Sequence, residues 1–167
     1  MSTVLLSQYA QRVYVVNFFQ NRGNFMYTYK DLKIGDSNYF EKTITEADVL
    51  LFSAVSGDCN PMHIDDEFAK NSQFGARIAH GALVASLIST ALTNAFPTSI
   101  YISQNTKFVA PVYLGSTIKA VVTCKEKLGK GKVLMQTNCY DQMGKLVIEG
   151  EAVTRLARDP EPEPENK

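Results

Sequence analysis

Residues 81–94 contain no charged side chain, and this stretch constrains the fold more than any other part of the chain. Small and aliphatic residues dominate it, a composition that predicts a helix. Small residues recur in steps of four at Gly81, Ala85 and Ser89, which would let a sheet or a partner helix come close. A helix without charge on any face should be buried all round, so the rest of the domain has to cover it.

The second half of the chain predicts a sheet that can provide this cover. Successive segments of strand character are separated by turns at 129–131 and 141–145. These segments are residues 99–108, 117–127, 130–140 and 146–156. In the second of them apolar residues alternate from Ile118 to Cys124, as expected for one face of a strand.

A strand and a helix are also predicted near the start of the domain. Ser37–Ile44 has strand character, Thr45 is placed to cap the following helix, and Asp48 occupies the capping-box position. Gly57 can end this helix. Together with the strands of the second half, this order indicates the α+β class, with a curved antiparallel sheet around a central apolar helix.

Composition excludes several classes of function. The chain has 167 residues, enough for one domain with short extensions, and 17 basic residues balance 17 acidic ones. Without a net basic field, nucleic acid is not an expected partner. No apolar run approaches the roughly 20 residues of a membrane span. Cys59, Cys124 and Cys139 match no zinc or redox spacing, so we expect reduced and mostly buried thiols.

Changes in composition set the domain boundaries. Residues 1–30 carry a few basic residues, no acidic one and many aromatics, and we expect an N-terminal extension outside the core. A targeting segment and a functional flap are the alternatives. The protein is therefore expected in the cytoplasm, or in the mitochondrial matrix if residues 1–30 are a transit segment. Residues 31–157 form the predicted domain, and the alternating Pro and Glu of residues 158–167 predict a disordered tail.

A short polar segment between the two predicted helices carries the candidate chemistry. Asp58 and His63 are five residues apart with Pro61 between them, and proline stops a helix, so the segment has to turn. A turn can bring a carboxylate and an imidazole together around one water, with which they exchange protons. One group can then act as the acid and the other as the base.

Gly81, at the start of the apolar helix, adds a third chemical element. The first residue of a helix has a backbone N–H without an intrahelical partner, at the positive end of the helix dipole. Glycine also lets a bound group approach the backbone closely. This combination suits a carbonyl oxygen that gains negative charge during a reaction.

These residues resemble those of a known family. The pattern Gly-Asp-x-Asn-Pro-hydrophobic-His at 57–63, followed by His80-Gly81, closely resembles the MaoC-like R-specific enoyl-thioester hydratases and dehydratases. The resemblance covers residues 31–156 and includes Phe108 and Gly115. It implies the hot-dog fold, an antiparallel sheet wrapped around one long helix. It also implies hydration of a trans-2-enoyl-CoA to the R-3-hydroxyacyl-CoA, or the reverse dehydration.

The resemblance assigns a role to each matching residue. Asp58 and His63 match the catalytic pair that activates the hydrating water, and Gly81 matches the residue whose N–H polarises the thioester carbonyl. Three positions are expected at the substrate site: Asn60 orders it, Ser89 lines it or packs inside the helix, and His80 has a structural role or acts as a second base.

No metal and no cofactor are expected, because the thioester itself activates the alkene. A metal site made of Asp58, His63 and Asp65 lacks the histidine spacing of hydrolytic zinc sites. Asp65 and Asp66 are instead expected to cap a short helix.

Three alternatives to the hydratase remain at this stage. The substrate can be carried by coenzyme A or by acyl carrier protein (ACP), as in the R-3-hydroxyacyl-ACP dehydratases of fatty-acid synthesis. A hot-dog thioesterase would be expected to place a carboxylate on the central helix, and residues 81–94 contain none. A non-catalytic acyl-thioester-binding protein would have little use for both Asp58 and His63. The family also implies a homodimer in which two sheets become one larger sheet, in line with the general preference for two-fold assemblies.

Overall fold

The computed structural model describes residues 29–96 and 99–156, so most of the predicted extension and the whole predicted tail lie outside the described residues. The described part contains one antiparallel sheet in the spatial order β1-β3-β4-β5-β2. Its strands are β1 Ser37–Thr43, β2 Ile100–Phe108, β3 Thr117–Gly129, β4 Lys132–Tyr140 and β5 Leu146–Arg155. The helices are α1 Glu46–Ser56, α2 Pro61–Ile64, α3 Asp66–Lys70 and α4 Gly81–Ala95. The α+β prediction and each predicted strand are confirmed, with ends that differ by one or two residues.

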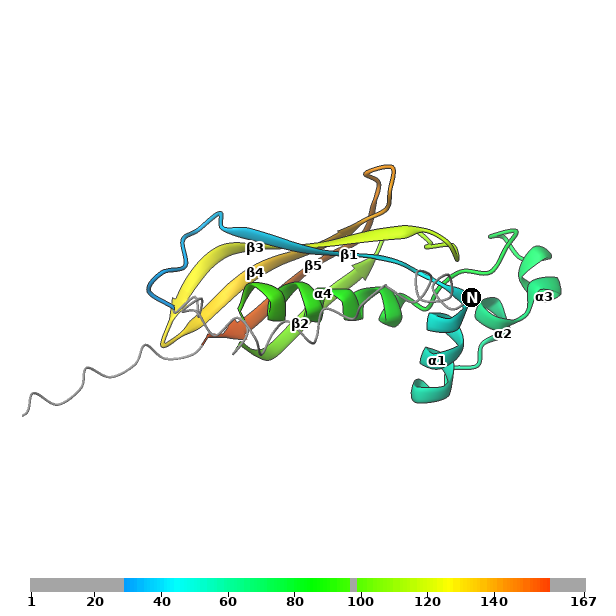
Figure 1. Cartoon of the computed structure of the whole chain (residues 1–167), viewed down its shortest axis with the longest axis horizontal. Coiled ribbons are helices and arrows are strands. Elements are labelled where there is room, and N and C mark those ends of the chain that lie inside the picture. The colour runs from blue at the N-terminus through cyan, green and yellow to red at the C-terminus, as the bar shows by residue number, and fades with distance from the viewer. Residues whose placement is uncertain (1–28, 97–98, 157–167) are drawn as a thin grey trace, which may run out of the picture.

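Helix α4 lies along the concave side of the curved sheet, as the hot-dog fold requires (Figure 1). Its inner side chains pack against β1 and β3, and they include Val84, Ile88 and Leu92, which are almost completely buried. Each such side chain contributes about 1.5–3 kcal/mol when it leaves water. From the sheet side, Ile118 and Val122 of β3 complete this core.

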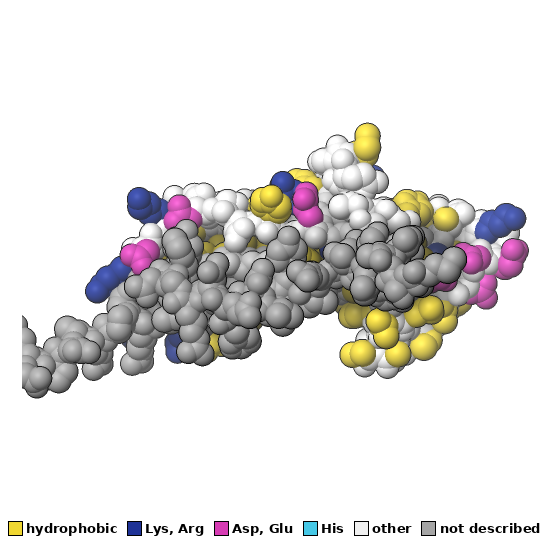
Figure 2. Space-filling view, in the orientation of Figure 1, with side chains coloured by type: hydrophobic (Ala, Val, Ile, Leu, Met, Phe, Trp, Pro, Cys, Tyr) yellow, Lys and Arg dark blue, Asp and Glu magenta, His cyan; other side chains and the backbone are white. Residues whose placement is uncertain are grey.

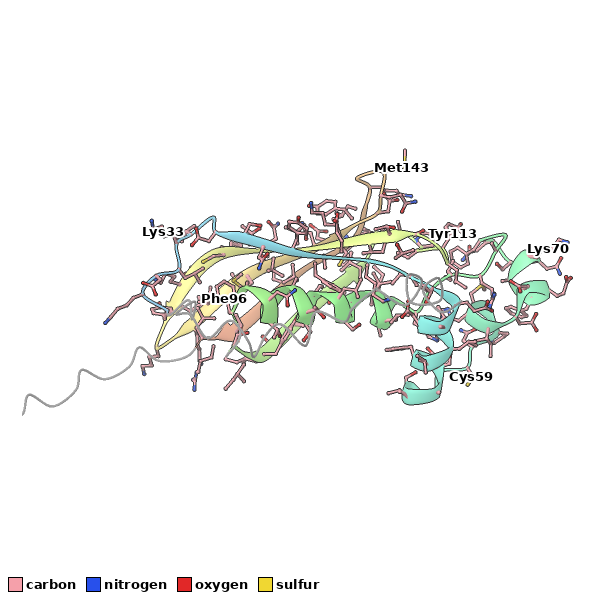
Figure 3. The ribbon with its side chains drawn as sticks, viewed as in Figure 1. Lys33, Cys59, Lys70, Phe96, Tyr113 and Met143 are labelled. Carbon is pink, nitrogen blue, oxygen red and sulfur yellow. The ribbon has the colours of Figure 1, made fainter. Side chains whose placement is uncertain are left out.

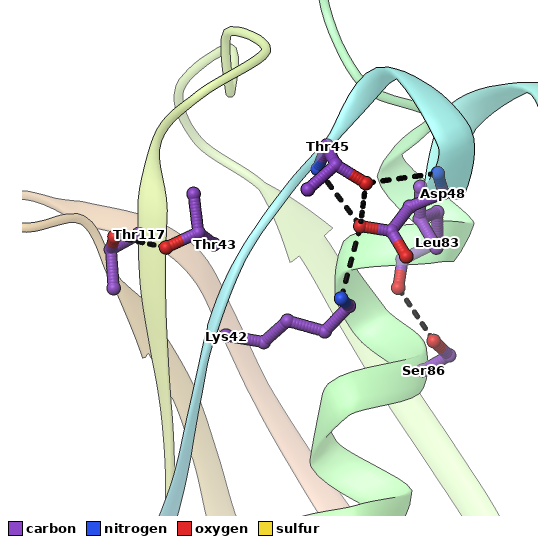
Figure 4. Close-up of polar contacts among 7 residues, drawn as sticks. All are labelled: Lys42, Thr43, Thr45, Asp48, Leu83, Ser86 and Thr117. Atoms are coloured by element: carbon purple, nitrogen blue, oxygen red, sulfur yellow. Dashed lines mark hydrogen bonds and ion pairs between the residues drawn. The ribbon is translucent and has the colours of Figure 1, made fainter. Parts of the chain in front are cut away.

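The prediction that α4 is buried all round is wrong for the single chain. Ala82, Ser86 and Ser89 are exposed on the side that faces away from the sheet. One sheet covers only one side of a helix, and in the described residues no second layer covers the other side. The Ser86 hydroxyl donates to the carbonyl of Leu83 at 2.6 Å, which satisfies it within the helix (Figure 4).

The capping box predicted for α1 is present at its first turn (Figure 4). The hydroxyl of Thr45 accepts from the backbone N–H of Asp48 at 3.2 Å, and the Asp48 carboxylate accepts from the Thr45 N–H at 2.8 Å. Lys42 of β1 forms an ion pair with the same carboxylate at 3.0 Å. Gly57 ends the helix in the left-handed region, with φ of 78°. Both ends of α1 are therefore set by the residues that the sequence indicates.

Two very short helices occupy the segment that the sequence describes only as a turn followed by a capped helix. Pro61 starts α2 because its fixed φ suits the first helical position, where its missing N–H costs nothing. Asp65 caps α3 by accepting from the N–H of Phe68 at 3.0 Å, which confirms its predicted role. Helices α1, α2 and α3 gather at one end of the molecule, beside the start of α4 (Figure 1).

The cysteines are free thiols, and two of the three are buried as predicted. Burial raises the pKa of the Cys139 thiol to about 12 and also raises that of Cys124, so neither is a ready nucleophile. Cys59 is exposed, at the outer side of the helical end (Figure 3). Among residues 29–96 and 99–156, no helix combines the length and the apolar character that crossing a membrane requires.

The capping box generates a pH prediction. Partial burial of the Asp48 carboxylate acts to raise its pKa, but the hydrogen bonds from Thr45 and the Lys42 ion pair outweigh burial, so the pKa lies below its ordinary value of 3.8. A lowered folded-state pKa stabilises the fold above the unfolded-state pKa, and this contribution is lost as pH falls through the folded-state value. The free-energy advantage of the wild type over Asp48→Asn should therefore be largest above about pH 4 and shrink below it. Urea unfolding of both proteins across this range measures the difference, and a difference independent of pH would contradict the role of Asp48.

Candidate active site

The end of α1 fixes the backbone on which Asp58 sits. Gly57 turns the chain, and the Asp58 carboxylate then accepts from the backbone N–H of Asn60 at 3.2 Å. Asn60 caps α2, because its side-chain oxygen accepts from the N–H of Met62 at 3.0 Å. These local bonds make a tight turn of the segment that carries Asp58, although its side chain remains exposed in the single chain.

His63 is buried at 8 % exposure, and one backbone carbonyl orients its ring. Its Nδ1–H donates to the carbonyl of Ile78 at 2.8 Å, which leaves Nε2 for the site. The segment that supplies this carbonyl is itself held to the chain after β2: Ala79 N–H donates to Val112 at 2.7 Å, and Ile78 forms a bridge with Tyr113. The ring orientation of His63 therefore depends on where residues 78–79 attach to the sheet.

The fold brings the predicted acid/base pair together. Asp58, His63 and His80 each offer one carboxylate oxygen or ring nitrogen, and these atoms lie within 4.8 Å of one another. A water that makes two hydrogen bonds of about 2.8 Å can bridge atoms up to about 5.5 Å apart. A single water can therefore contact the carboxylate and an imidazole at the same time, which is what proton exchange in both directions needs.

The same group of residues is poorly arranged for a metal ion. The rings of His63 and His80 lie against each other in a tilted arrangement, with centroids 3.8 Å apart and planes 34° apart. Nδ1 of His63 and Nε2 of His80 each already contact a backbone carbonyl, so only one nitrogen of each ring is left as a ligand. Asp65 does not join the group, because it caps α3.

Gly81 is the first residue of α4, as predicted, and the ring of Phe108 covers it. A side chain added at Gly81 would place Cβ 2.7 Å from Cε1 of Phe108, closer than real contacts allow. Any larger residue at this position would therefore require the Phe108 ring to move. The backbone N–H of Gly81 has no intrahelical acceptor, because it belongs to the first turn.

A pocket of about 470 Å³ begins at these residues. His63 and Gly81 lie in its wall, and Phe74, Val84 and Phe108 are among the apolar side chains that line it. An apolar pocket with a few polar groups at one point is typical of small-molecule sites. The chemistry of the lining suits an acyl chain whose polar head lies at His63 and Gly81.

The three residues predicted to contact substrate have different positions. Asn60 lies in the turn between Asp58 and His63, where it caps α2. Ser89 lies two turns along α4 from Gly81, on the exposed side, and is not among the residues that line the pocket of the single chain. His80 is 2 % exposed, and it contacts the backbone of Asp58 and the ring of His63. Whether any of them touches substrate stays a prediction.

Two residues that support the site are not apparent from the sequence patterns. Arg77 bridges Glu46 of α1 at 2.9 Å and Asp66 of α3 at 2.7 Å, so it ties the two ends of the helical segment. These partners raise the pKa of the Arg77 guanidinium, with the hydrogen bond to Glu46 as the largest cause. Ser53 is buried inside α1, and its hydroxyl lies 3.3 Å from Nε2 of His80. A polar residue four positions after buried Val49, on the same helix face, is the signal that could have marked Ser53.

Comparison with known proteins places the chain in a family. The model of the MaoC like domain family matches residues 32–141. An (R)-specific enoyl-CoA hydratase of Rhodospirillum rubrum is 42% identical over 134 residues, which cover 78% of this chain and 92% of that protein. A mitochondrial 3-hydroxyacyl-acyl-carrier-protein dehydratase of Solanum lycopersicum is 39% identical over 128 residues, covering 75% of this chain and 78% of the relative.

Solved structures give the same result. An unliganded R-hydratase from Pseudomonas aeruginosa superposes with a TM-score of 0.76 at 40% identity, covering 79% of this chain and 86% of the other. An (R)-hydratase from Aeromonas caviae superposes with a TM-score of 0.74 at 34% identity, covering 77% of this chain and 99% of the other. The hot-dog fold is thereby confirmed, and the chain belongs to the MaoC-like dehydratase family.

Proposed function

We propose that this protein adds water to trans-2-enoyl thioesters to give R-3-hydroxyacyl thioesters, or catalyses the reverse dehydration. The observation that carries the proposal is the approach of Asp58 and His63 to within 4.8 Å, beside an apolar pocket that begins at Gly81. The names of the similar hydratases and dehydratases support the same reaction.

The mechanism requires one water between Asp58 and His63. One of the two groups removes a proton from this water as its oxygen attacks C3 of the substrate, and the other delivers a proton to C2. The addition is syn when both groups act from the same side of the substrate. Gly81 N–H donates to the thioester oxygen as negative charge grows there. The reaction needs no external electron carrier, since water supplies both added groups.

The rival functions have less support. Helix α4 contains no acidic residue, although a hot-dog thioesterase would be expected to place its carboxylate there. A non-catalytic binding protein would not need the carboxylate and the imidazole together. Coenzyme A and ACP both remain candidates for the carrier, because relatives of each kind are similar to this chain. The compartment we propose is the cytoplasm, with the mitochondrial matrix as the alternative, since some relatives are named as mitochondrial.

A homodimer is part of the proposal, and the exposed surface of β2 supports it. Edge strand β2 presents Ile100 and Ile102 to solvent at 63% and 47% exposure. An exposed apolar edge strand is a template for pairing with another strand. Apolar side chains also gather on α1, where Leu51 and Val55 are exposed (Figure 2). A second copy that pairs through β2 would extend the sheet across both chains.

The acid/base assignment predicts the effect of Asp58→Asn. The change keeps the shape of the side chain but removes its charge, so kcat should fall by about 10²–10⁴-fold while the fold is unchanged. The measurement is loss of the enoyl-thioester absorbance of crotonyl-CoA, with the product resolved by an R- or S-specific hydroxyacyl dehydrogenase. Asp141→Asn, in the β4–β5 turn, is the matched control and should keep the wild-type rate. A near-normal rate in Asp58→Asn would sink the assignment.

The role of the Gly81 N–H is tested by comparing two substitutions at that position. Both Gly81→Ala and Gly81→Pro add a Cβ against Phe108, but only proline removes the N–H. Proline is tolerated at the first helical position, and His80 already has the extended backbone that a residue before proline needs, with φ of −58° and ψ of 132°. Loss of one oxyanion donor costs about 10²–10³-fold, so kcat of Gly81→Pro should lie that far below kcat of Gly81→Ala. Equal rates would show that the N–H has no part in the reaction.

The dimer prediction is tested at β2. Ile102→Lys places a charge on the proposed pairing edge and should shift the protein from dimer to monomer, as measured by light scattering. Met143→Lys adds the same charge in the β4–β5 turn, where Met143 projects away from the sheet at 83% exposure, and should leave the mass unchanged (Figure 3). A wild-type protein that is strictly monomeric would contradict the proposal.

A further inference from the structure

His80 contacts both members of the catalytic pair, although it does not line the pocket. It is 2 % exposed and directly precedes Gly81. Its own carbonyl accepts from Val84 N–H at 3.2 Å, which starts the hydrogen bonding of α4. His80 thus contacts Asp58 and His63 and also begins the helix whose first residue is Gly81.

The contact with Asp58 is made to its backbone. Nε2 of His80 lies 3.0 Å from the carbonyl oxygen of Asp58. A carbonyl only accepts hydrogen bonds, so this bond requires hydrogen on Nε2, and the Ser53 hydroxyl at 3.3 Å is then a second, longer acceptor of the same N–H. Because the Asp58 side chain is exposed, this bond is a fixed point for a residue that would otherwise depend on its turn alone.

The contact with His63 is made through the ring face. The two rings lie against each other in a tilted arrangement, with centroids 3.8 Å and planes 34° apart, and Phe52 of α1 lies near His80 at 4.9 Å with planes 52° apart. His80 is therefore enclosed between an aromatic ring of α1 and the catalytic imidazole. This contact restricts rotation of the His63 imidazole. The ring is also held by the hydrogen bond from its Nδ1 to the Ile78 carbonyl.

A histidine at this position carries a cost that a purely packing residue would avoid. Nδ1 of His80 is buried and has no hydrogen-bond partner among the described residues. An unsatisfied buried polar atom costs about 1–3 kcal/mol. An aromatic hydrocarbon ring would fill the same space without this cost, but it would have no donor for Asp58.

We propose that His80 is a positioning residue, whose Nε2–H holds the backbone of Asp58 while its ring holds the imidazole of His63. This inference rests on the proposed hydratase function and goes beyond it, since it gives His80 a role through Asp58 and His63 and no proton transfer of its own. It predicts that the donor and the ring can be separated by substitution, and that their loss lowers kcat and leaves KM unchanged.

Two variants separate the two contacts. His80→Phe keeps an aromatic ring and removes the donor, and His80→Gln keeps an amide N–H near the position of Nε2 and removes the ring. In His80→Phe, kcat on crotonyl-CoA should fall by about 10–10²-fold, because small misplacement of a catalytic group costs up to about 10²-fold. His80→Gln should recover part of this loss. Thr154→Val is the control for a loss of stability alone. It removes the hydrogen bond from buried Thr154 to Ile100, near the C-terminal end of β5, and should keep the wild-type kcat.

The outcomes are distinguishable from failure of the proposed function. An active, R-specific wild type together with wild-type kcat in His80→Phe would overturn the positioning role alone. An inactive wild type on coenzyme A and ACP substrates would overturn the hydratase and this inference with it. A readout that needs neither turnover nor a variant is ¹⁵N NMR of the imidazoles, since the chain has only 2 histidines. The spectrum should show His80 as the Nε2–H tautomer and His63 as Nδ1–H, and an Nδ1–H tautomer at His80 would contradict the bond to Asp58.

Discussion

The burial of α4 against a single curved sheet is the constraint on which the rest of the structure depends. The helix has no charge to place in water, so the sheet follows its length and fixes where its first residue lies. That residue is Gly81. Shortly before it, Ile78 and Ala79 are bonded to the chain that follows β2. The position of the candidate active site is thus set by the packing of the core and by a short backbone bridge.

Backbone carbonyls do most of the positioning inside the site. The carbonyl of Ile78 orients His63, and the carbonyl of Asp58 accepts from His80. Side-chain ion pairs act further out, where Arg77 joins α1 to α3. In the proposed function, the Asp58 carboxylate and Nε2 of His63 bind the water and the apolar pocket receives the acyl chain. Water addition to an enoyl thioester needs little more than these groups and one N–H for the carbonyl oxygen.

Much of the fold could be predicted from the sequence, because its signals are local. The capping box at Thr45, the left-handed Gly57 and the alternation on β3 each follow from a few neighbouring residues. The proximity of Asp58 and His63 was also accessible, because Gly57 ends α1 and Pro61 starts α2, so the chain has to turn between the two helices. The exposure of one side of α4 could not be predicted, because burial depends on how many layers the tertiary structure provides. Contacts between distant segments, such as Phe108 on Gly81 and the carbonyl of Ile78 on His63, leave no pattern in the chain.

The central claim is that one water is added from one face by a carboxylate and an imidazole held together. Hydration of crotonyl-CoA in D₂O tests it most directly, with the configuration at C2 and C3 of the product read by NMR. The account predicts the R configuration at C3 and a single configuration at C2, with deuterium delivered to the same face as oxygen. Deuterium on the face opposite to oxygen, or a mixture of configurations at C2, would contradict it, because the proton at C2 would then not come from the pair. An S configuration at C3 would contradict the R-specific reaction.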